Sequence, residues 1–499
     1  MKKITPVIIV NSLNVQRGGI TKATIKRANF LAEHYNEVLI ITFLYQQYHN
    51  QIIQQLYNQK ILSKKVKVYN FFENIKPNKN IRKNKKVQQI EERGFVVLPV
   101  EKLQKEPSYR YYKDGLYVKY KRFNSNGSLK FIDYMDESGR RKRREEFNEH
   151  GILVRTRHMD ILNNKPKYDQ YFDNKGKCFL SVHINSETGK EGRVATFLNK
   201  AKEYPEFYHC QLEWVNHILS EIEYPVVSNE LRRFSKLLIN VKHKNIKKIE
   251  VFHSSHLSEP FNDINKIKPG SHYVFENAKY FDKIVFLTNE QKSDVENVYG
   301  KNNNFTVIPH STYINKEKEY AVKRNQKLAV TLARYHDVKR LDEAIKAFKH
   351  VVAKIPEAKY YIYGYGEMKE KLQSLIKELG LEDNIYLKPF TSTPQKSYKE
   401  ASCSILTSRQ EGFAMVITES MAAGTPVIAY AFKYGPKDII SDGVNGYIVE
   451  ENNREELSQK IIRVMEDKNL SKSLSASALK VKETFSEERY RRNWLEIYQ

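Results

Sequence analysis

Short apolar runs and amphipathic stretches alternate over the first 75 residues of the chain. Three runs have the length and β-branched content of buried strands: residues 7–10, 38–43 and 66–69. Residues 21–34 carry the spacing of an amphipathic helix. Strands that alternate with helices predict a parallel sheet. Gly18 and Gly19 follow the first strand and allow a close backbone approach to a ligand, although a bare turn explains them equally well.

The same alternation resumes near residue 205 and continues toward the end of the chain. A helix is expected at 209–222, followed by strands at 224–227, 249–252, 284–287 and 306–308. A second series of strands is expected at 328–332, 360–363, 385–387, 404–406, 427–430 and 447–449. Helices are expected at 341–352 and from about 414, and Gly424 and Pro426 end the latter. The pattern predicts two doubly wound α/β domains that face a cleft.

Residues 76–204 interrupt this pattern and lack helical periodicity. Glycines recur at positions 115, 127, 139 and 151, a period of 12, and again at 176 and 189. A short repeat with turn residues at fixed offsets favours antiparallel hairpins, so we expect an inserted β-meander. The expected domains are 1–75 with 205–312, the insert at 76–204, and a second α/β domain at 313–485. The final helix, 486–499, is expected to pack back on the first domain.

Charge narrows the possible partners. The formal net charge is +25, and the insert holds basic residues at 82–86 and in one continuous run: Arg140, Arg141, Lys142, Arg143 and Arg144. Such an excess attracts nucleic acid, a membrane surface or an acidic polymer. No helix-turn-helix, zinc-finger or RRM pattern accompanies the charge, so nucleic-acid binding is the weaker alternative. Three widely spaced cysteines, no signal peptide and no apolar run of about 18 residues predict a soluble cytoplasmic protein.

Polar residues at expected strand ends suggest chemistry. Arg334 follows one strand and Lys339 lies just before a helix, which suits a diphosphate. Glu411 lies in a loop and Glu419 in the next helix, eight residues on. For the two cations and for the two glutamates, the alternative is solvated surface charge without a function. Because both pairs occur in one domain, this alternative is weaker.

Two histidines end a strand of the first α/β domain. His253 and His256 follow the run 249–252 and would face the cleft, where they could contact a transferred group or move a proton. A hydrogen-bonded core histidine is the alternative for at least one of them. No D-x-D motif and no metal-type Cys/His spacing occurs, so metal dependence is not indicated.

The motifs of the second domain, Arg334…Lys339, Gly364-x-Gly366 and Glu411…Glu419, resemble the donor domain of retaining glycosyltransferases of the GT-B fold, family 4. The insert and the segments 17–21, 393–396 and 433–436 are more similar to wall teichoic acid α-glycosyltransferases, which decorate poly(glycerol phosphate) or poly(ribitol phosphate). Bacterial adhesin O-GlcNAc transferases carry a similar insert. The resemblance covers about 1–75 and 205–499, and it implies a GT-B fold of two Rossmann-like domains with an inserted antiparallel β-meander.

The resemblance also implies roles for the residues that match. Arg334 and Lys339 would hold the diphosphate, Glu411 would face the developing oxocarbenium charge, and His253 would lie beside the transferred sugar. The implied donor-binding residues, including Glu419 at the ribose, are Gly18, Gly19, Gly364, Gly412, Phe413, Ala414, Met415, Glu419 and His256. The implied reaction is retaining, uses a UDP-sugar as substrate and needs no metal or other cofactor.

The acceptor remains open between related polymers. A polyanionic acceptor suits the basic insert, and glucose transfer to poly(glycerol phosphate) is slightly favoured. The alternatives are transfer of GlcNAc from UDP-GlcNAc to poly(ribitol phosphate) or to a serine-rich adhesin. The basic run Arg140–Arg144 is expected to bind the polymer. The resemblance implies a homotrimer formed through the insert, and the charge is compatible with peripheral contact at the inner membrane face.

Overall fold

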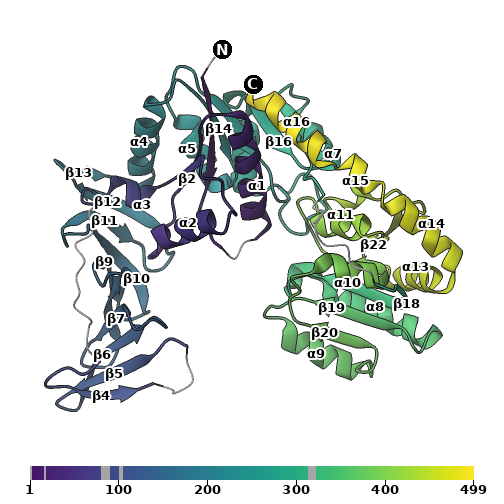
Figure 1. Ribbon diagram of the computed structural model, residues 1–499, viewed down its shortest axis with the longest axis horizontal. Coiled ribbons are helices and arrows are strands. Elements are labelled where there is room, and N and C mark those ends of the chain that lie inside the picture. The colour runs from purple at the N-terminus through teal and green to yellow at the C-terminus, as the bar shows by residue number, and fades with distance from the viewer. Residues whose placement is uncertain (1–2, 16–17, 80–89, 101–104, 313–321) are drawn as a thin grey trace. The chain divides into compact units, whose positions relative to one another are not determined.

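The computed structural model describes residues 3–15, 18–79, 90–100, 105–312 and 322–499 (Figure 1). Residue 17 and the basic residues at 82–86, which the sequence analysis singled out, lie outside the described residues. The chain divides into two compact units, one of residues 1–227 with 236–246 and one of residues 228–235 with 247–499.

The first unit begins with a parallel arrangement of strands. These are β1 (Ile4–Val10), β2 (Val38–Thr42) and β3 (Val66–Asn70), and β2 pairs with both of the others. The accompanying helices are α1 (Gly19–His34), α2 (His49–Asn58), α3 (Phe71–Ile75) and α4 (Phe207–Ser220). The Asn70 side chain starts α3 by accepting hydrogen bonds from the Phe72 and Glu73 amides. The predicted strands and α1 are confirmed, whereas α2 and α3 were not predicted.

The insert forms a ten-stranded antiparallel sheet among the described residues. Its strands follow the chain order: β4 (Val96–Pro99), β5 (Ser108–Lys113), β6 (Leu116–Phe123), β7 (Leu129–Met135), β8 (Arg141–Phe147), β9 (Leu153–Asp160), β10 (Lys165–Phe172), β11 (Cys178–Ile184), β12 (Glu191–Phe197) and β13 (Ala201–Tyr204). The repeated glycines lie in the turns, where Gly127 donates to the Asn124 carbonyl and Gly151 to the Asn148 carbonyl. The predicted β-meander is confirmed.

Strand β14 (Tyr224–Asn229), the short helix η1 (Arg232–Phe234) and α5 (Ser235–Asn240) carry the chain between the units. The second unit then forms three parallel strands: β15 (Lys247–Val251), β16 (Lys283–Phe286) and β17 (Phe305–Val307). Helices α6 (Pro269–Glu276) and α7 (Asn289–Tyr299), with η2 (Ala278–Tyr280), connect them.

The remainder of the second unit contains a six-stranded parallel sheet, in the order β20-β19-β18-β21-β22-β23 among the described residues. Its strands are β18 (Asn325–Leu332), β19 (Lys359–Tyr363), β20 (Ile385–Lys388), β21 (Ala401–Leu406), β22 (Val427–Tyr430) and β23 (Gly446–Val449). The helical elements are η3 (Asp337–Lys339), α8 (Leu341–Lys354), α9 (Lys369–Glu378), α10 (Pro394–Glu400), α11 (Met415–Ala422), α12 (Pro436–Ile439), α13 (Arg454–Glu466), α14 (Lys468–Ala478), α15 (Val481–Thr484) and α16 (Glu487–Tyr498).

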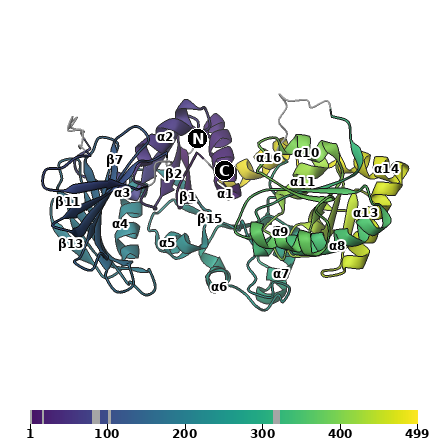
Figure 2. The same ribbon diagram turned by 90° about the horizontal axis from the view of Figure 1, so that it is seen from below.

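Helices cover both faces of this sheet, with α8 and α13 on one side and α10 and α11 on the other (Figure 2). The buried part of strand β18, residues 328–331, is apolar except for Thr331, whose hydroxyl donates to the Ile405 carbonyl. Ala329 packs in the core that contains Phe348 of α8, whereas Leu328 and Val330 pack with Tyr398 of α10. A strand segment buried on both faces favours apolar residues on both, and full burial of a large apolar side chain stabilises the fold by roughly 1.5–3 kcal/mol. The sheet places the loops after β18, β21 and β22 at one edge.

The C-terminal helix α16 packs by its aromatic face. Trp494 is 1% exposed, and the Tyr498 hydroxyl donates a 3.0 Å hydrogen bond to the Ser228 hydroxyl within the same unit. Within the described part of the chain, no helix is both long and apolar enough to span a membrane.

Candidate active site

Lys339 and Glu411 meet because the strands that precede them are neighbours in the sheet. Lys339 lies in η3 after β18, and Glu411 lies in the loop after β21. The Thr407 hydroxyl holds the first loop in place by donating to the carbonyls of residues 339 and 340. The Lys339 ammonium forms an ion pair with the Glu411 carboxylate, which also accepts a 2.9 Å hydrogen bond from the Ser408 hydroxyl. Both charged side chains are 17% exposed, so a ligand can reach them.

The Glu411 loop is fixed from the opposite side by the loop after β22. The Glu411 amide donates to the Lys433 carbonyl at 3.1 Å, and the Tyr434 amide donates to the Glu411 carbonyl at 3.2 Å. The Lys433 ammonium pairs with Asp294, whose carboxylate also accepts a 2.8 Å hydrogen bond from the Tyr434 hydroxyl. The backbone that carries Glu411 is therefore held between the loops after β21 and β22.

Gly412 permits an unusually close backbone contact. A Cβ atom at this position would lie less than 3.0 Å from the carbonyl oxygen of His253, a distance that real Cβ atoms almost never show. Gly435 allows a similar approach to the Phe413 carbonyl and has a φ of 122°. Next to these glycines, Ala414 adopts the left-handed conformation with a φ of 60° and begins α11. The segment 412–414 is thus shaped by backbone packing against its neighbours.

His253 is held by a carboxylate that the sequence analysis did not identify. Its Nε2 lies 2.6 Å from a carboxylate oxygen of Glu230, and the two side chains are 4% and 0% exposed. The imidazole stacks on that of His310 with a centroid distance of 5.5 Å, and His310 meets the edge of Phe413 at 5.8 Å. Glu230 directly follows β14, so its position at a strand end was the available signal.

His256 is enclosed by protein. Its side chain is fully buried, stacks on Tyr434 at 5.7 Å, and meets the edge of Phe275 at 5.5 Å. The Gln291 amide lies 3.4 Å from its Nδ1. Burial lowers the pKa of His256 to about 4, with smaller effects from three charged groups: Asp294, Lys433 and Lys268. The structure therefore places His256 in the interior, in the setting of a neutral core histidine.

Arg334 and the Gly364-x-Gly366 segment lie beside the same strand end. Arg334 is exposed and forms no ion pair within the described residues, so its charge is available to a ligand. Gly364 packs against the Ala333 carbonyl and Gly366 against the Tyr335 carbonyl, each too closely for a Cβ atom. The two glycines shape the loop that carries Arg334.

The remaining predicted donor residues divide between the units. Glu419 is half-buried in α11 and lies near Tyr398, whose pKa is raised chiefly by burial and further by the Glu419 charge. Phe413 is buried and Met415 is half-buried at the start of α11. Gly18 and Gly19 lie in the first unit at the start of α1, and a Cβ atom at either would meet nothing within 4 Å.

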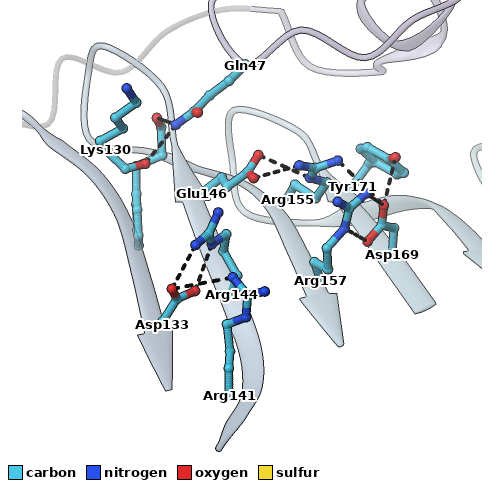
Figure 3. A network of polar contacts seen from close by, with 11 residues as sticks. Gln47, Lys130, Asp133, Arg141, Arg144, Glu146, Arg155, Arg157, Asp169 and Tyr171 are labelled. Atoms are coloured by element: carbon cyan, nitrogen blue, oxygen red, sulfur yellow. Dashed lines mark hydrogen bonds and ion pairs between the residues drawn. The ribbon is translucent and has the colours of Figure 1, made fainter. Parts of the chain in front are cut away.

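The predicted polymer-binding run lies on β8 and the turn before it. Arg144 donates two hydrogen bonds of 2.7 Å to Asp133 on β7, and the Arg141 guanidinium lies 3.6 Å from the same carboxylate (Figure 3). The other two arginines have carboxylates of their own: Arg140 pairs with Asp136 at 3.3 Å and Arg143 with Glu145 at 3.0 Å. Lys142 is exposed and forms no ion pair among the described residues. The arginines of the run are therefore engaged within the sheet.

The same network continues across β9 and β10. Arg155 donates to Glu146 at 2.6 and 3.1 Å, and Arg157 donates to Asp169 at 2.8 and 2.7 Å (Figure 3). The Tyr171 hydroxyl also donates to Asp169 at 3.3 Å. Opposite charges that face each other across neighbouring strands favour one register over its alternatives. Several arginines of the insert thus contribute to strand pairing.

Comparisons with known proteins match part or all of the chain. Residues 313–481 match the family model described as glycosyl transferases group 1. The chain is 29% identical to the poly(ribitol-phosphate) alpha-N-acetylglucosaminyltransferase of Staphylococcus aureus (strain COL), with all of both chains covered. It is 28% identical to the poly(glycerol-phosphate) alpha-glucosyltransferase of Bacillus subtilis (strain 168), over 96% of this chain and 72% of the relative. A crystal structure of an S. aureus TarM mutant in complex with fondaparinux, alpha-GlcNAc-glycerol and UDP matches with a TM-score of 0.82 and 26% identity, and 100% of each chain is covered.

Proposed function

We propose that this chain, a glycosyltransferase of the GT-B fold, transfers glucose from UDP-glucose to hydroxyl groups of poly(glycerol phosphate) with retention of the α configuration. The chain resembles teichoic acid glycosyltransferases along its whole length. The observation that supports this most strongly is the meeting of Lys339 and Glu411 beside the exposed Arg334 at one edge of the sheet. Two cations suit a diphosphate, and the carboxylate suits a sugar whose anomeric carbon becomes positive.

The proposed reaction assigns a role to each group. Arg334 and Lys339 bind the diphosphate and neutralise the charge that grows as it leaves. Lys339 leaves Glu411 as the diphosphate arrives, so the carboxylate becomes free to face the sugar. The acceptor hydroxyl attacks the anomeric carbon from the side on which the bond to the diphosphate breaks. Its proton passes to the leaving phosphate oxygen, and UDP departs.

Further positions complete the proposed donor site. The backbone amides of residues 412–415, at the start of α11, would hold sugar hydroxyls, and Glu419 would accept a hydrogen bond from the ribose. Gly18 and Gly19 would close over the phosphates. His253 would lie beside the sugar, whereas His256 supports the site from the interior. Protein cations supply the neutralising charge, so we propose that transfer needs no metal.

A second candidate is GlcNAc transfer from UDP-GlcNAc to poly(ribitol phosphate). The 29% identity to the S. aureus relative over the full length of both chains favours it about as much as the B. subtilis relative favours glucose. The two candidates share the Lys339–Glu411 pair and the diphosphate chemistry. They differ in the polyol and in the sugar, and loop shape around 412–415 would select the sugar.

The insert at 76–204 is proposed to serve assembly and acceptor binding. We propose a homotrimer formed through this sheet, and weak attraction of the basic chain to the inner membrane face or to the anionic polymer. Light scattering on the purified chain tests the trimer, and binding to vesicles with and without anionic lipid tests the membrane contact.

Four separate reactions test the proposed function. UDP-glucose and UDP-GlcNAc are each presented with poly(glycerol phosphate) and with poly(ribitol phosphate), and UDP release is followed. The expected result is fastest release with UDP-glucose and the glycerol polymer, with an α linkage in the product by NMR. Fast release only with UDP-GlcNAc and the ribitol polymer would establish the second candidate. Absence of transfer in all four, together with salt-sensitive DNA binding, would overturn both. Activity lost on treatment with a chelator would refute the metal-free mechanism.

A further inference from the structure

We propose that Glu230 is a positioning residue for His253: it holds the imidazole with Nε2 toward its carboxylate and leaves Nδ1 for the transferred sugar. The inference rests on the proposed function, in which His253 lies beside that sugar. Glu230 would act through His253 and would not touch the substrate itself.

The contact between the two side chains defines which ring nitrogen is protonated. Nε2 of His253 lies 2.6 Å from the Glu230 carboxylate, and a carboxylate can only accept a hydrogen bond, so the proton must be on Nε2. A neutral ring then carries its lone pair on Nδ1. Nδ1 is shielded from water and has no hydrogen-bond partner within the described residues. A buried polar atom without a partner costs about 1–3 kcal/mol, and a sugar hydroxyl would supply the missing donor.

The surroundings restrict the ring in two directions. Stacking on His310, with an angle of 12° between the rings, sets the ring plane, and Glu230 sets the rotation within that plane. The His253 carbonyl oxygen packs against Gly412, so the backbone that carries the ring touches the proposed donor loop. A ring with a fixed plane, a fixed rotation and a fixed tautomer offers one defined acceptor at the site.

A second buried carboxylate, that of Glu250, interacts electrostatically with Glu230. Glu250 is fully buried and has its own partners: Arg232, Asn229 at 2.9 and 3.0 Å, and Ser235 at 2.5 Å. Burial raises the pKa of Glu250, which reduces its competition for the local positive charge. Glu230 and His310 contact the imidazole, and the charges of both Glu250 and Glu230 act on Arg232.

Substitutions at Glu230 and His253 test the inference as a double-mutant cycle. Glu230→Met removes the carboxylate at nearly constant volume, and Glu230→Gln keeps an oxygen that can accept from Nε2. We expect Glu230→Met to lower kcat by about 10- to 100-fold, and Glu230→Gln to restore part of the loss. In a His253→Asn background, Glu230→Met should cause no further loss of kcat. Glu296→Met, which makes the same replacement at a glutamate of α7 that is ion-paired with Lys292, is the matched control and should leave kcat unchanged.

A measurement independent of activity follows the ring itself. Nitrogen-15 NMR of histidine-labelled protein should show His253 with Nε2 protonated and Nδ1 bare, and Glu230→Met should produce a mixture of the two tautomers. An unchanged tautomer in Glu230→Met, or losses of kcat that add fully in the double variant, would overturn the inference. If His253→Asn transfers sugar at the full rate, the proposed role of His253 fails. If His253→Asn is slow and Glu230→Met is not, only the role of Glu230 fails.

Discussion

The ion pair between Lys339 and Glu411 makes a prediction with an unexpected sign. Without a donor, the two side chains neutralise each other, so a diphosphate must compete with Glu411 for the lysine. Glu411→Gln removes the competing charge. UDP contains the diphosphate but no sugar, so it gains a free lysine and loses no contact with Glu411. We therefore expect Glu411→Gln to bind UDP more tightly than the unmodified chain while losing transfer activity.

The size of the effect follows from the exposure of the pair. Both side chains are 17% exposed, which places the pair between a surface and a buried ion pair, and its coupling is about 1 kcal/mol. One kcal/mol corresponds to about a fivefold change in Kd, so titration calorimetry should show UDP binding about fivefold tighter in Glu411→Gln. The gain should shrink at high salt, because salt screens partly exposed charges. Transfer should fall at least 100-fold, because the carboxylate that faces the developing positive charge is gone.

Ser408→Ala is the matched control for this prediction. It removes the 2.9 Å hydrogen bond to the same carboxylate but leaves both charges in place. We expect its affinity for UDP to remain close to that of the unmodified chain. Unchanged or weaker UDP binding in Glu411→Gln would refute the exchange of partners by Lys339. Full transfer activity in Glu411→Gln would refute the role of Glu411.

Three further predictions concern packing, the insert and pH. Gly412→Ala should lower both the melting temperature and transfer, because the added Cβ has no space; an unchanged melting curve would contradict this contact. Arg144→Ala should reduce the free energy of unfolding by about 1–3 kcal/mol in denaturant titrations, because two hydrogen bonds to the Asp133 carboxylate are lost. Lys142→Ala should leave the free energy of unfolding unchanged, and equal effects of the two substitutions would argue against the cross-strand network. His256 of the unfolded chain takes up a proton below pH 6.5, whereas His256 of the folded chain does so only near pH 4. The free energy of unfolding should therefore fall by about 3 kcal/mol as the pH is lowered from 6.5 to 4. The aromatic replacement His256→Phe should flatten that dependence, and an unaltered slope would refute it.

Some of the candidate site residues could be proposed from the sequence because their positions depend on local order. Arg334, Lys339 and Glu411 follow apolar runs, and the carboxyl ends of parallel strands share one edge. A 12-residue spacing of glycines was likewise enough to predict an antiparallel insert. Local pattern was less useful where helices are amphipathic and highly charged: α13 and α14 were not predicted, although each begins with a capping side chain, from Asn453 and Asp467.

The pair His253 and His256 shows most clearly what only the tertiary structure decided. The two residues stand three positions apart at one strand end, and the sequence alone left both as candidates. Burial against Tyr434, from a distant loop, makes one a core histidine, and the other contacts Glu230, which follows β14. The basic run behaves likewise, since Arg144 lies opposite Asp133 only through strand register. Residue type and order along the chain determined the strands, the repeats and the candidate chemistry. Long-range packing determined which charges are paired and which side chains are buried, because those partners are distant in the sequence.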